Sequence, residues 1–104
     1  MKYMLTWNER SQGSAIEYEK AQQRILDVFR SWQQPANFKI EMFVIRVGDW
    51  GGYMLVDCDD PVEVHKLCSM LPAFTFEARV VVPIEDAMRG ELEVMAWRDG
   101  LKFD

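Results

Sequence analysis

The sequence predicts an α+β fold of the ferredoxin-like type, in which a four-stranded antiparallel sheet carries two helices on one face. Apolar residues alternate with period two in four segments and recur every three or four residues in two segments between them. The resulting order is strand, helix, strand, strand, helix, strand, followed by one more helical segment. With 104 residues, 49% of them hydrophobic, the chain can bury one core but not two. We therefore expect a single domain over residues 1–104, with a core over residues 1–83 and a C-terminal helix over about residues 85–98.

The first strand and the first helix are predicted by alternation and by a capping pattern. Residues 2–7 alternate as a strand whose two faces are both largely apolar. Ser14 and Glu17 have the spacing of a capping box, so a helix is expected to begin at Ser14. Pro35 is expected to mark the end of this helix. The inner stripe of the helix consists of Tyr18, Ala21, Ile25, Val28, Phe29 and Trp32.

A hairpin follows, made of two strands joined by a glycine-rich turn. Residues 38–45 alternate, which predicts a strand that buries one face. Gly48, Gly51 and Gly52 supply a tight reversal, and residues 53–58 return as the second strand. The buried face of the first of these strands is expected to hold Phe38, Ile40, Met42 and Val44.

The second helix has a strong start signal, and a fourth strand follows it. Asp60 is placed to cap the helix, Pro61 stands at its first position and Glu63 favours the positive end of the helix dipole. Pro72 is expected to stop this helix, and residues 76–82 alternate as the last strand. The inner stripe of the helix consists of Val64, Leu67, Cys68 and Leu71.

Right-handed crossovers place the first and third strands in the centre of the sheet and the second and fourth at its edges. The central strands are apolar on both faces, yet two helices cover only one face of such a sheet. The other face therefore needs a cover, and we expect a partner subunit to provide it in a homodimer. The competing cover is the C-terminal helix, whose apolar stripe consists of Ile84, Met88, Leu92 and Met95.

Composition excludes several classes of protein. The chain has 17 acidic and 12 basic residues, and its basic residues form no run, which argues against a nucleic-acid partner. No apolar run approaches the ~18 residues of a membrane span, and polar residues from Asn8 onward argue against a signal peptide. Cys58 and Cys68 are too few for a disulfide framework. We expect a soluble cytoplasmic protein that contacts no membrane.

Three segments carry a resemblance to a known family: residues 2–7, residues 54–60 and residues 76–84. They resemble the strands and the helix cap of the domain-of-unknown-function family 3303, and the resemblance covers about residues 1–88. It implies a small protein of the dimeric ferredoxin-like α+β barrel group and carries over no catalytic residue. That group includes cofactor-free oxygenases and isomerases of aromatic or lactone compounds, an analogy of fold alone.

No metal or cofactor is expected from the sequence. Asp57, Asp59 and Asp60 form the only acidic cluster, but a calcium site needs more oxygen ligands in a loop, and the helix cap explains Asp60. The glycines of residues 48–52 precede no helix and have no lysine placed to meet a phosphate.

The candidate ligand site is an aromatic constellation on the two central strands. Tyr3, Trp7 and Tyr53 are expected to line one cavity, with His65 and Arg79 as polar groups. The ligand would be a planar or aromatic molecule with an acidic or carbonyl group. Alternation points Arg79 toward the expected partner subunit, so the pocket lies either between sheet and helices without Arg79 or between subunits with it. The competing interpretation is that the aromatic residues only fill the core or the dimer interface.

Three functions are compatible with these features. The first is a dimeric protein that binds a small organic molecule without catalysis or cofactor. The second is a cofactor-free enzyme of the oxygenase or isomerase kind, for which His65, the only histidine, is the candidate base. The third is a structural or interaction module.

Overall fold

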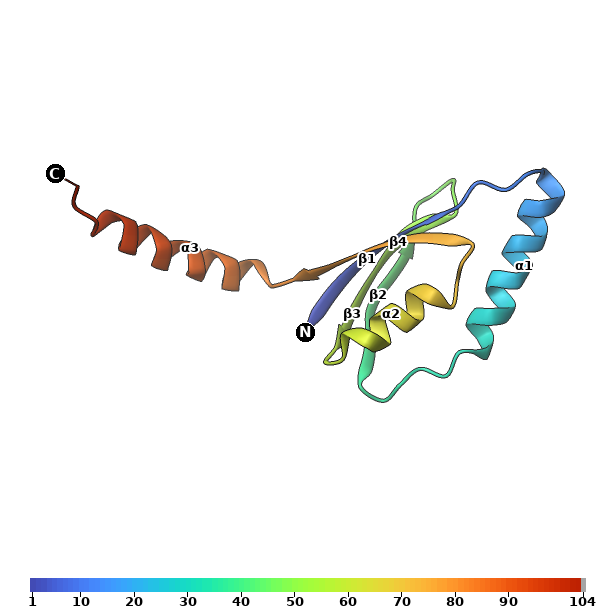
Figure 1. Ribbon diagram of the computed structural model, residues 1–104, viewed down its shortest axis with the longest axis horizontal. Coiled ribbons are helices and arrows are strands. Elements are labelled where there is room, and N and C mark those ends of the chain that lie inside the picture. The colour runs from blue at the N-terminus through green and yellow to red at the C-terminus, as the bar shows by residue number, and fades with distance from the viewer. Residues whose placement is uncertain (104) are drawn as a thin grey trace.

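The computed structural model describes residues 1–103 and confirms the predicted ferredoxin-like α+β architecture with a C-terminal helix (Figure 1). The four strands form one antiparallel sheet in the order β2-β3-β1-β4, so the first and third strands are central, as predicted. The elements are β1 (Lys2–Glu9), α1 (Ala15–Ser31), β2 (Phe38–Ile45), β3 (Gly51–Cys58), α2 (Pro61–Ser69), β4 (Phe74–Val81) and α3 (Ile84–Asp99).

Side-chain caps fix the starts of α1 and α2. The Ser14 hydroxyl accepts a hydrogen bond from the Glu17 backbone N–H at 3.2 Å, and the Glu17 carboxylate accepts one from the Gly13 N–H at 2.9 Å. The reciprocal bond of the predicted capping box thus goes to the residue before the cap. Asp60 caps α2 as predicted, since its carboxylate accepts from the Val62 N–H at 2.9 Å.

The core lies on the face of the sheet that α1 and α2 cover, called here the helix face. One cluster joins the middle of the sheet to α2, and a second joins Trp7 and Phe74 of the sheet to Ile25 of α1 and to Leu71 just after α2. The buried residues of the first cluster are Tyr3, Leu5, Phe38, Met54, Val56, Cys58, Val64 and Leu67.

The alternation predicted for residues 38–45 is wrong beyond Ile40. The register of β2 against β3 shifts between Ile40 and Met42, so a bulge at Glu41 adds one residue to β2. The bulge moves Met42 and Val44 to the opposite face of the sheet and turns Phe43 to the helix face. Because residues 42–45 are apolar on both sides of the strand, the sequence pattern is the same with or without the bulge.

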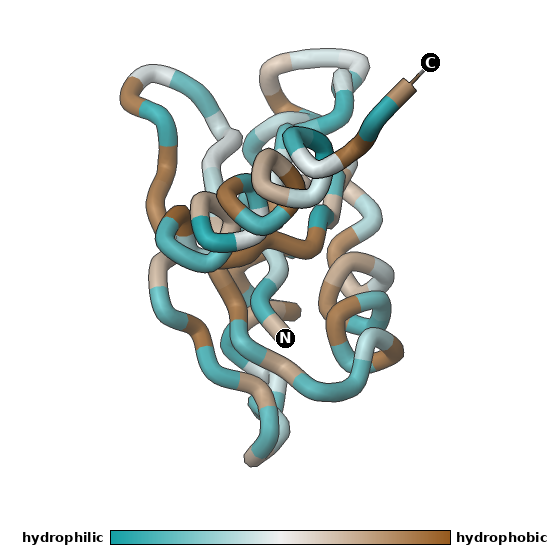
Figure 2. Tube along the Cα trace, turned by 90° about the vertical axis from the view of Figure 1, so that its left-hand side faces the viewer, coloured by the Kyte–Doolittle hydropathy of each residue, from teal (hydrophilic) through white to brown (hydrophobic). Residues whose placement is uncertain are grey.

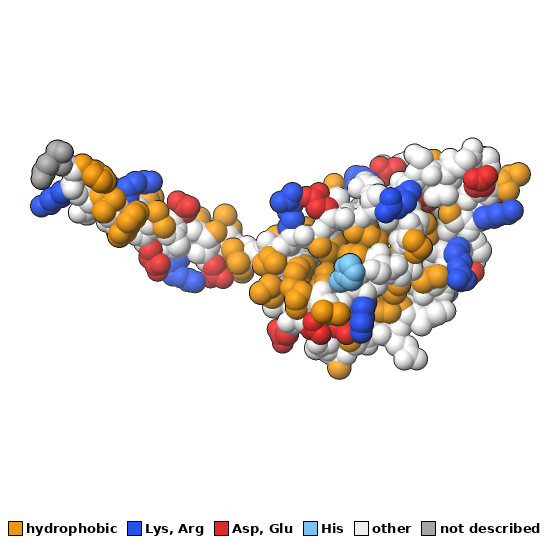
Figure 3. Space-filling view, viewed as in Figure 1, with side chains coloured by type: hydrophobic (Ala, Val, Ile, Leu, Met, Phe, Trp, Pro, Cys, Tyr) orange, Lys and Arg blue, Asp and Glu red, His pale blue; other side chains and the backbone are white. Residues whose placement is uncertain are grey.

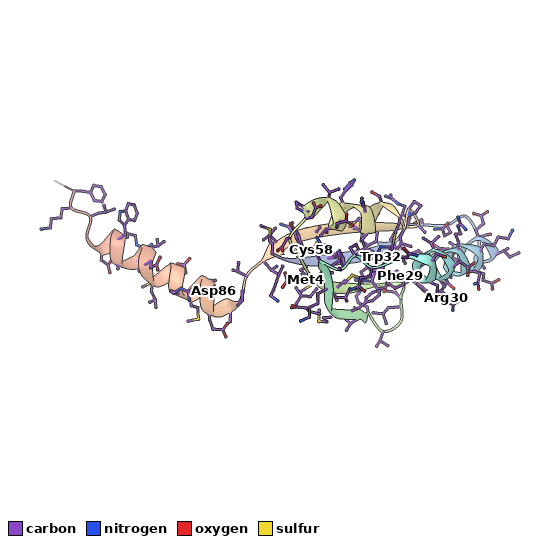
Figure 4. All side chains as sticks on the ribbon, turned by 90° about the horizontal axis from the view of Figure 1, so that it is seen from below. Met4, Phe29, Arg30, Trp32, Cys58 and Asp86 are labelled. Atoms are coloured by element: carbon purple, nitrogen blue, oxygen red, sulfur yellow. The ribbon has the colours of Figure 1, made fainter. Side chains whose placement is uncertain are left out.

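Within residues 1–103 no helix packs on the second face of the sheet, which we call the open face (Figure 1). Its centre is formed by Met4 and Thr6 of β1, Met42 and Val44 of β2, and Tyr53 and Leu55 of β3. Met4 and Cys58, both labelled in Figure 4, belong to the open face and the helix face respectively.

The C-terminal helix does not cover the open face of its own chain. α3 extends away from the sheet, and the molecule measures 68 × 32 × 22 Å (Figure 1). No residue of α3 is buried. In Figure 2, where α3 projects toward the viewer, apolar and polar residues are interspersed along it. None of the helices within residues 1–103 is long and apolar enough to cross a membrane.

Candidate functional site

A partly open cavity of about 300 Å³ lies on the helix face, between α1 and one end of the sheet. Strands β1 to β4, α1, α2 and the turn before β3 all contribute to its wall. Its lining is almost wholly apolar and consists of Trp7, Ile25, Leu26, Phe29, Arg30, Phe43, Trp50, Met54, Leu67, Leu71, Phe74 and Phe76.

Trp7 forms the floor of this cavity on the central strand β1. Its ring contacts Phe43 edge-on at a centroid distance of 5.9 Å and Phe74 in a tilted geometry at 5.0 Å. Gly52 lies opposite Trp7 on β3, and a Cβ atom there would come within 2.9 Å of the indole ring. Glycine at position 52 therefore leaves the room that the Trp7 ring occupies.

The indole N–H of Trp7 is a polar group without a partner in this apolar wall. Trp7 is only 6% exposed, and its Nε1 has no hydrogen-bond acceptor within residues 1–103. Leaving a buried donor unpaired costs about 1–3 kcal/mol. The Nε1 atom is itself covered by surrounding side chains, so an acceptor oxygen of a bound molecule would reach it only if those side chains shift.

Arg30 is the only charged residue among those that line the cavity. It lies near the C-terminal end of α1, directly after Phe29, and Figure 4 labels both. The Arg30 side chain is exposed and lines the cavity through its apolar part, because the wall contains almost no polar surface, so the guanidinium lies outside the wall. A guanidinium there can pair with a carboxylate whose apolar body lies inside.

A second, polar hollow adjoins the cavity, and Trp50 contributes to both. Glu9, the residue of the helix face that follows Trp7, lines this hollow. One Glu9 carboxylate oxygen is buried and has no hydrogen-bond partner within residues 1–103, and burial raises the pKa of Glu9. Arg46, which also lines the hollow, donates to Asp49 at 3.2 Å and to the Asn8 side chain.

The five residues predicted for the ligand site lie in three places. Trp7 alone lines the apolar cavity. Tyr3 and His65 line a wider hollow between α2 and β4. Tyr53 and Arg79 belong to the open face, where Arg79 forms an ion pair with its neighbour Glu77.

His65 is exposed at the surface of α2, where the histidine is coloured pale blue in Figure 3. Its Nε2 lies 3.3 Å from the hydroxyl of Ser69, and no acidic side chain is bonded to it within residues 1–103. This part of the chain also contains no group of three acidic, cysteine or histidine side chains able to hold a metal ion.

The sequence did not predict that most of the residues in the cavity wall lie together. The signals were present separately: Ile25 and Phe29 belong to the inner stripe of α1, and Leu67 and Leu71 to that of α2. Arg30 gave no signal, because an arginine beside an inner stripe is usually a solvated neighbour.

Fold and site together define the class of protein: a ferredoxin-like α+β domain with an aromatic-lined cavity on the helix face of its sheet. The chain belongs to the family described as Domain of unknown function (DUF3303), whose family model matches residues 1–95. The match thus includes the sheet, α1, α2 and most of α3. No curated protein matches the chain significantly.

Proposed function

We propose that this protein binds a small planar aromatic molecule with a carboxylate or carbonyl group in the cavity between α1 and the sheet. The observation that carries the proposal is an almost wholly apolar, aromatic-lined cavity with one charged side chain, Arg30, in its lining. A volume of about 300 Å³ is at the lower end of the range for ligand pockets, which suits a molecule of one or two fused rings.

In this proposal Trp7 and Arg30 orient the ligand. A flat ring packs against Trp7 and Phe43, since aromatic pairs favour edge-on and offset contacts. A carboxylate of the ligand pairs with Arg30, or a carbonyl oxygen accepts from the Trp7 N–H once the side chains that cover it shift. In this proposal Arg30 takes the part that the sequence suggested for Arg79.

The proposal is one of binding without chemistry. The residues that line the cavity include no carboxylate, histidine, hydroxyl or thiol. A bound molecule would therefore meet apolar walls that include two tryptophans, with one arginine beside them.

The test compares 2-naphthoate with its uncharged analogue 2-naphthamide by isothermal titration. Arg30→Gln should weaken naphthoate binding about 3- to 10-fold, as expected for a partly exposed charged hydrogen bond, and leave naphthamide binding unchanged. Arg24→Gln is the matched control, because Arg24 is also an exposed α1 arginine but does not line the cavity.

A second pair of variants tests the location. Leu26→Trp places a bulky ring in the cavity wall and should abolish binding of both probes. Ile16→Trp adds the same ring at an exposed position of α1 outside the cavity and should leave binding intact. Absence of binding of both probes to the native protein, or full binding by Leu26→Trp, would contradict the proposal.

A further inference from the structure

We propose that α3 is an exchanged arm: in a dimer of two copies of this chain, the α3 helix of each copy lies on the open face of the other. This interaction is on the opposite face of the sheet from the ligand cavity and is independent of the proposed binding function.

The first argument is that α3 displays apolar residues to water along its length. Ile84, Met88, Leu92 and Met95 recur at helical spacing, and between 43% and 67% of each is exposed. The ion pair that α3 forms within residues 1–103, Arg89 with Asp86, is internal to the helix. Such a helix has low stability by itself, because most helix stability in proteins comes from packing an apolar face. The helix therefore needs a surface from another molecule or from its own sheet.

The second argument is that the link to α3 opposes folding back onto its own open face. Only Val82 and Pro83 separate β4 from α3, and Pro83 is extended with φ −56° and ψ 146°. The residue before a proline is disfavoured in the helical region, so Val82 is also kept extended. A reversal within two such residues is unfavourable, and a short hinge of this kind favours exchange with a second copy.

The third argument is the character of the open face, which has the anatomy of an interface. Its apolar centre, defined above, includes Met42, Val44 and Tyr53, of which 36%, 45% and 38% is exposed. Some of the charged groups at its margin are paired, as in Lys2 with Glu41 at 2.6 Å and Arg79 with Glu77. An apolar centre with a polar rim is typical of protein interfaces.

The length of α3 also matches the length of the open face. A helix of 16 residues is about 24 Å long and a strand of eight residues about 26 Å, so α3 spans the length of the sheet. Burying one apolar side chain removes on the order of 100 Å² from water. With four such side chains on each arm and the surface beneath them, two exchanged arms bury on the order of 1,500 Å², within the range of stable interfaces.

The molecule that covers the open face is therefore a second copy of this chain, because the same chain supplies both the uncovered face and a free helix of matching length. The two contacts are identical by symmetry, which makes the dimer closed and two-fold.

The first experiment measures the mass of the full chain by sedimentation at micromolar concentration. The native chain should sediment at twice 12.2 kDa, and the double variant Met88→Glu/Leu92→Glu should sediment at 12.2 kDa. Both residues are more than half exposed, so the variant keeps its own fold, which circular dichroism verifies. Gly90→Glu is the matched control on the other side of α3, where an added Cβ meets no other part of the described structure within 4 Å, and it should remain dimeric.

The second experiment locates the arm. Chains with Leu92→Cys are mixed with differently tagged chains with Tyr53→Cys, both with Cys68→Ser, and are then oxidised. Disulfides should form between the two kinds of chain, and replacing Leu92→Cys by Gly90→Cys should prevent them. A monomeric native chain, a dimer that tolerates Met88→Glu/Leu92→Glu, or disulfides that join only Tyr53→Cys chains to one another would overturn the proposal. The last result would indicate direct pairing of two sheets.

Discussion

Phe38 tests how much of the stability of this small domain depends on its apolar core. Phe38 is the largest of the fully buried side chains, at 2% exposure, and begins the edge strand β2. Its ring meets Trp32 edge-on at a centroid distance of 5.4 Å. Phe38→Ala therefore removes both a buried ring and an aromatic contact.

The expected loss follows from these two contributions. Truncating a buried phenylalanine to alanine costs about 3–5 kcal/mol, and the edge-on contact with Trp32 adds about 0.5–1.5 kcal/mol beyond burial alone. We expect Phe38→Ala to lower the free energy of unfolding by about 4 kcal/mol, a large share of the 5–15 kcal/mol typical of a domain. At about 4–8 °C per kcal/mol, Tm should fall by roughly 15–30 °C.

Phe103→Ala is the matched control, because the same residue type is 87% exposed at position 103. Urea denaturation followed by circular dichroism should show a change of less than about 0.5 kcal/mol for this variant. The reasoning is refuted if Phe38→Ala loses less than about 1.5 kcal/mol, or if the two variants lose equal amounts.

Three further predictions concern local features. Asp60→Ala removes the cap of α2 and should cost about 1 kcal/mol in chemical denaturation, whereas Asp59→Ala, at a side chain that is 92% exposed, should cost almost nothing. Gly52→Ala should strongly destabilise or unfold the protein, because a Cβ at position 52 meets a backbone oxygen of β2. Gly90→Ala should raise the free energy of unfolding by about 0.5–1 kcal/mol, because a Cβ at position 90 meets nothing within 4 Å and alanine favours the helix over glycine. Equal thermal stability of the two variants would contradict this prediction. Because burial raises the pKa of Glu9, the native free energy of unfolding includes a contribution that is present at low pH and is lost as pH rises through that pKa. The stability of Glu9→Gln relative to the native protein should therefore increase between about pH 4 and about pH 7, and a pH-independent difference would show that Glu9 is not desolvated.

The candidate ligand site could be predicted from the sequence only in part. Trp7 was among the residues expected to line a cavity, and strand alternation fixes the face to which it points, but the sequence left open whether the pocket lies between sheet and helices or between subunits. The charged residue in the cavity lining was not foreseen. Arg79 lies on the open face by the same alternation, and Arg30 reaches the cavity only through the placement of α1 relative to the sheet.

The sequence by itself determined the element order, the helix caps and the central position of β1 and β3, because these follow from local periodicity, short-range hydrogen bonds and the handedness of crossovers. Only the tertiary structure decided three other features. The bulge at Glu41 depends on pairing with β3, the cavity depends on the spacing between α1 and the sheet, and the detachment of α3 depends on the extended link through Pro83. Each of these features is set by the relative position of elements far apart in the chain. The spacing of apolar residues in the sequence is the same whichever surface covers them in the folded protein, so it cannot specify that position.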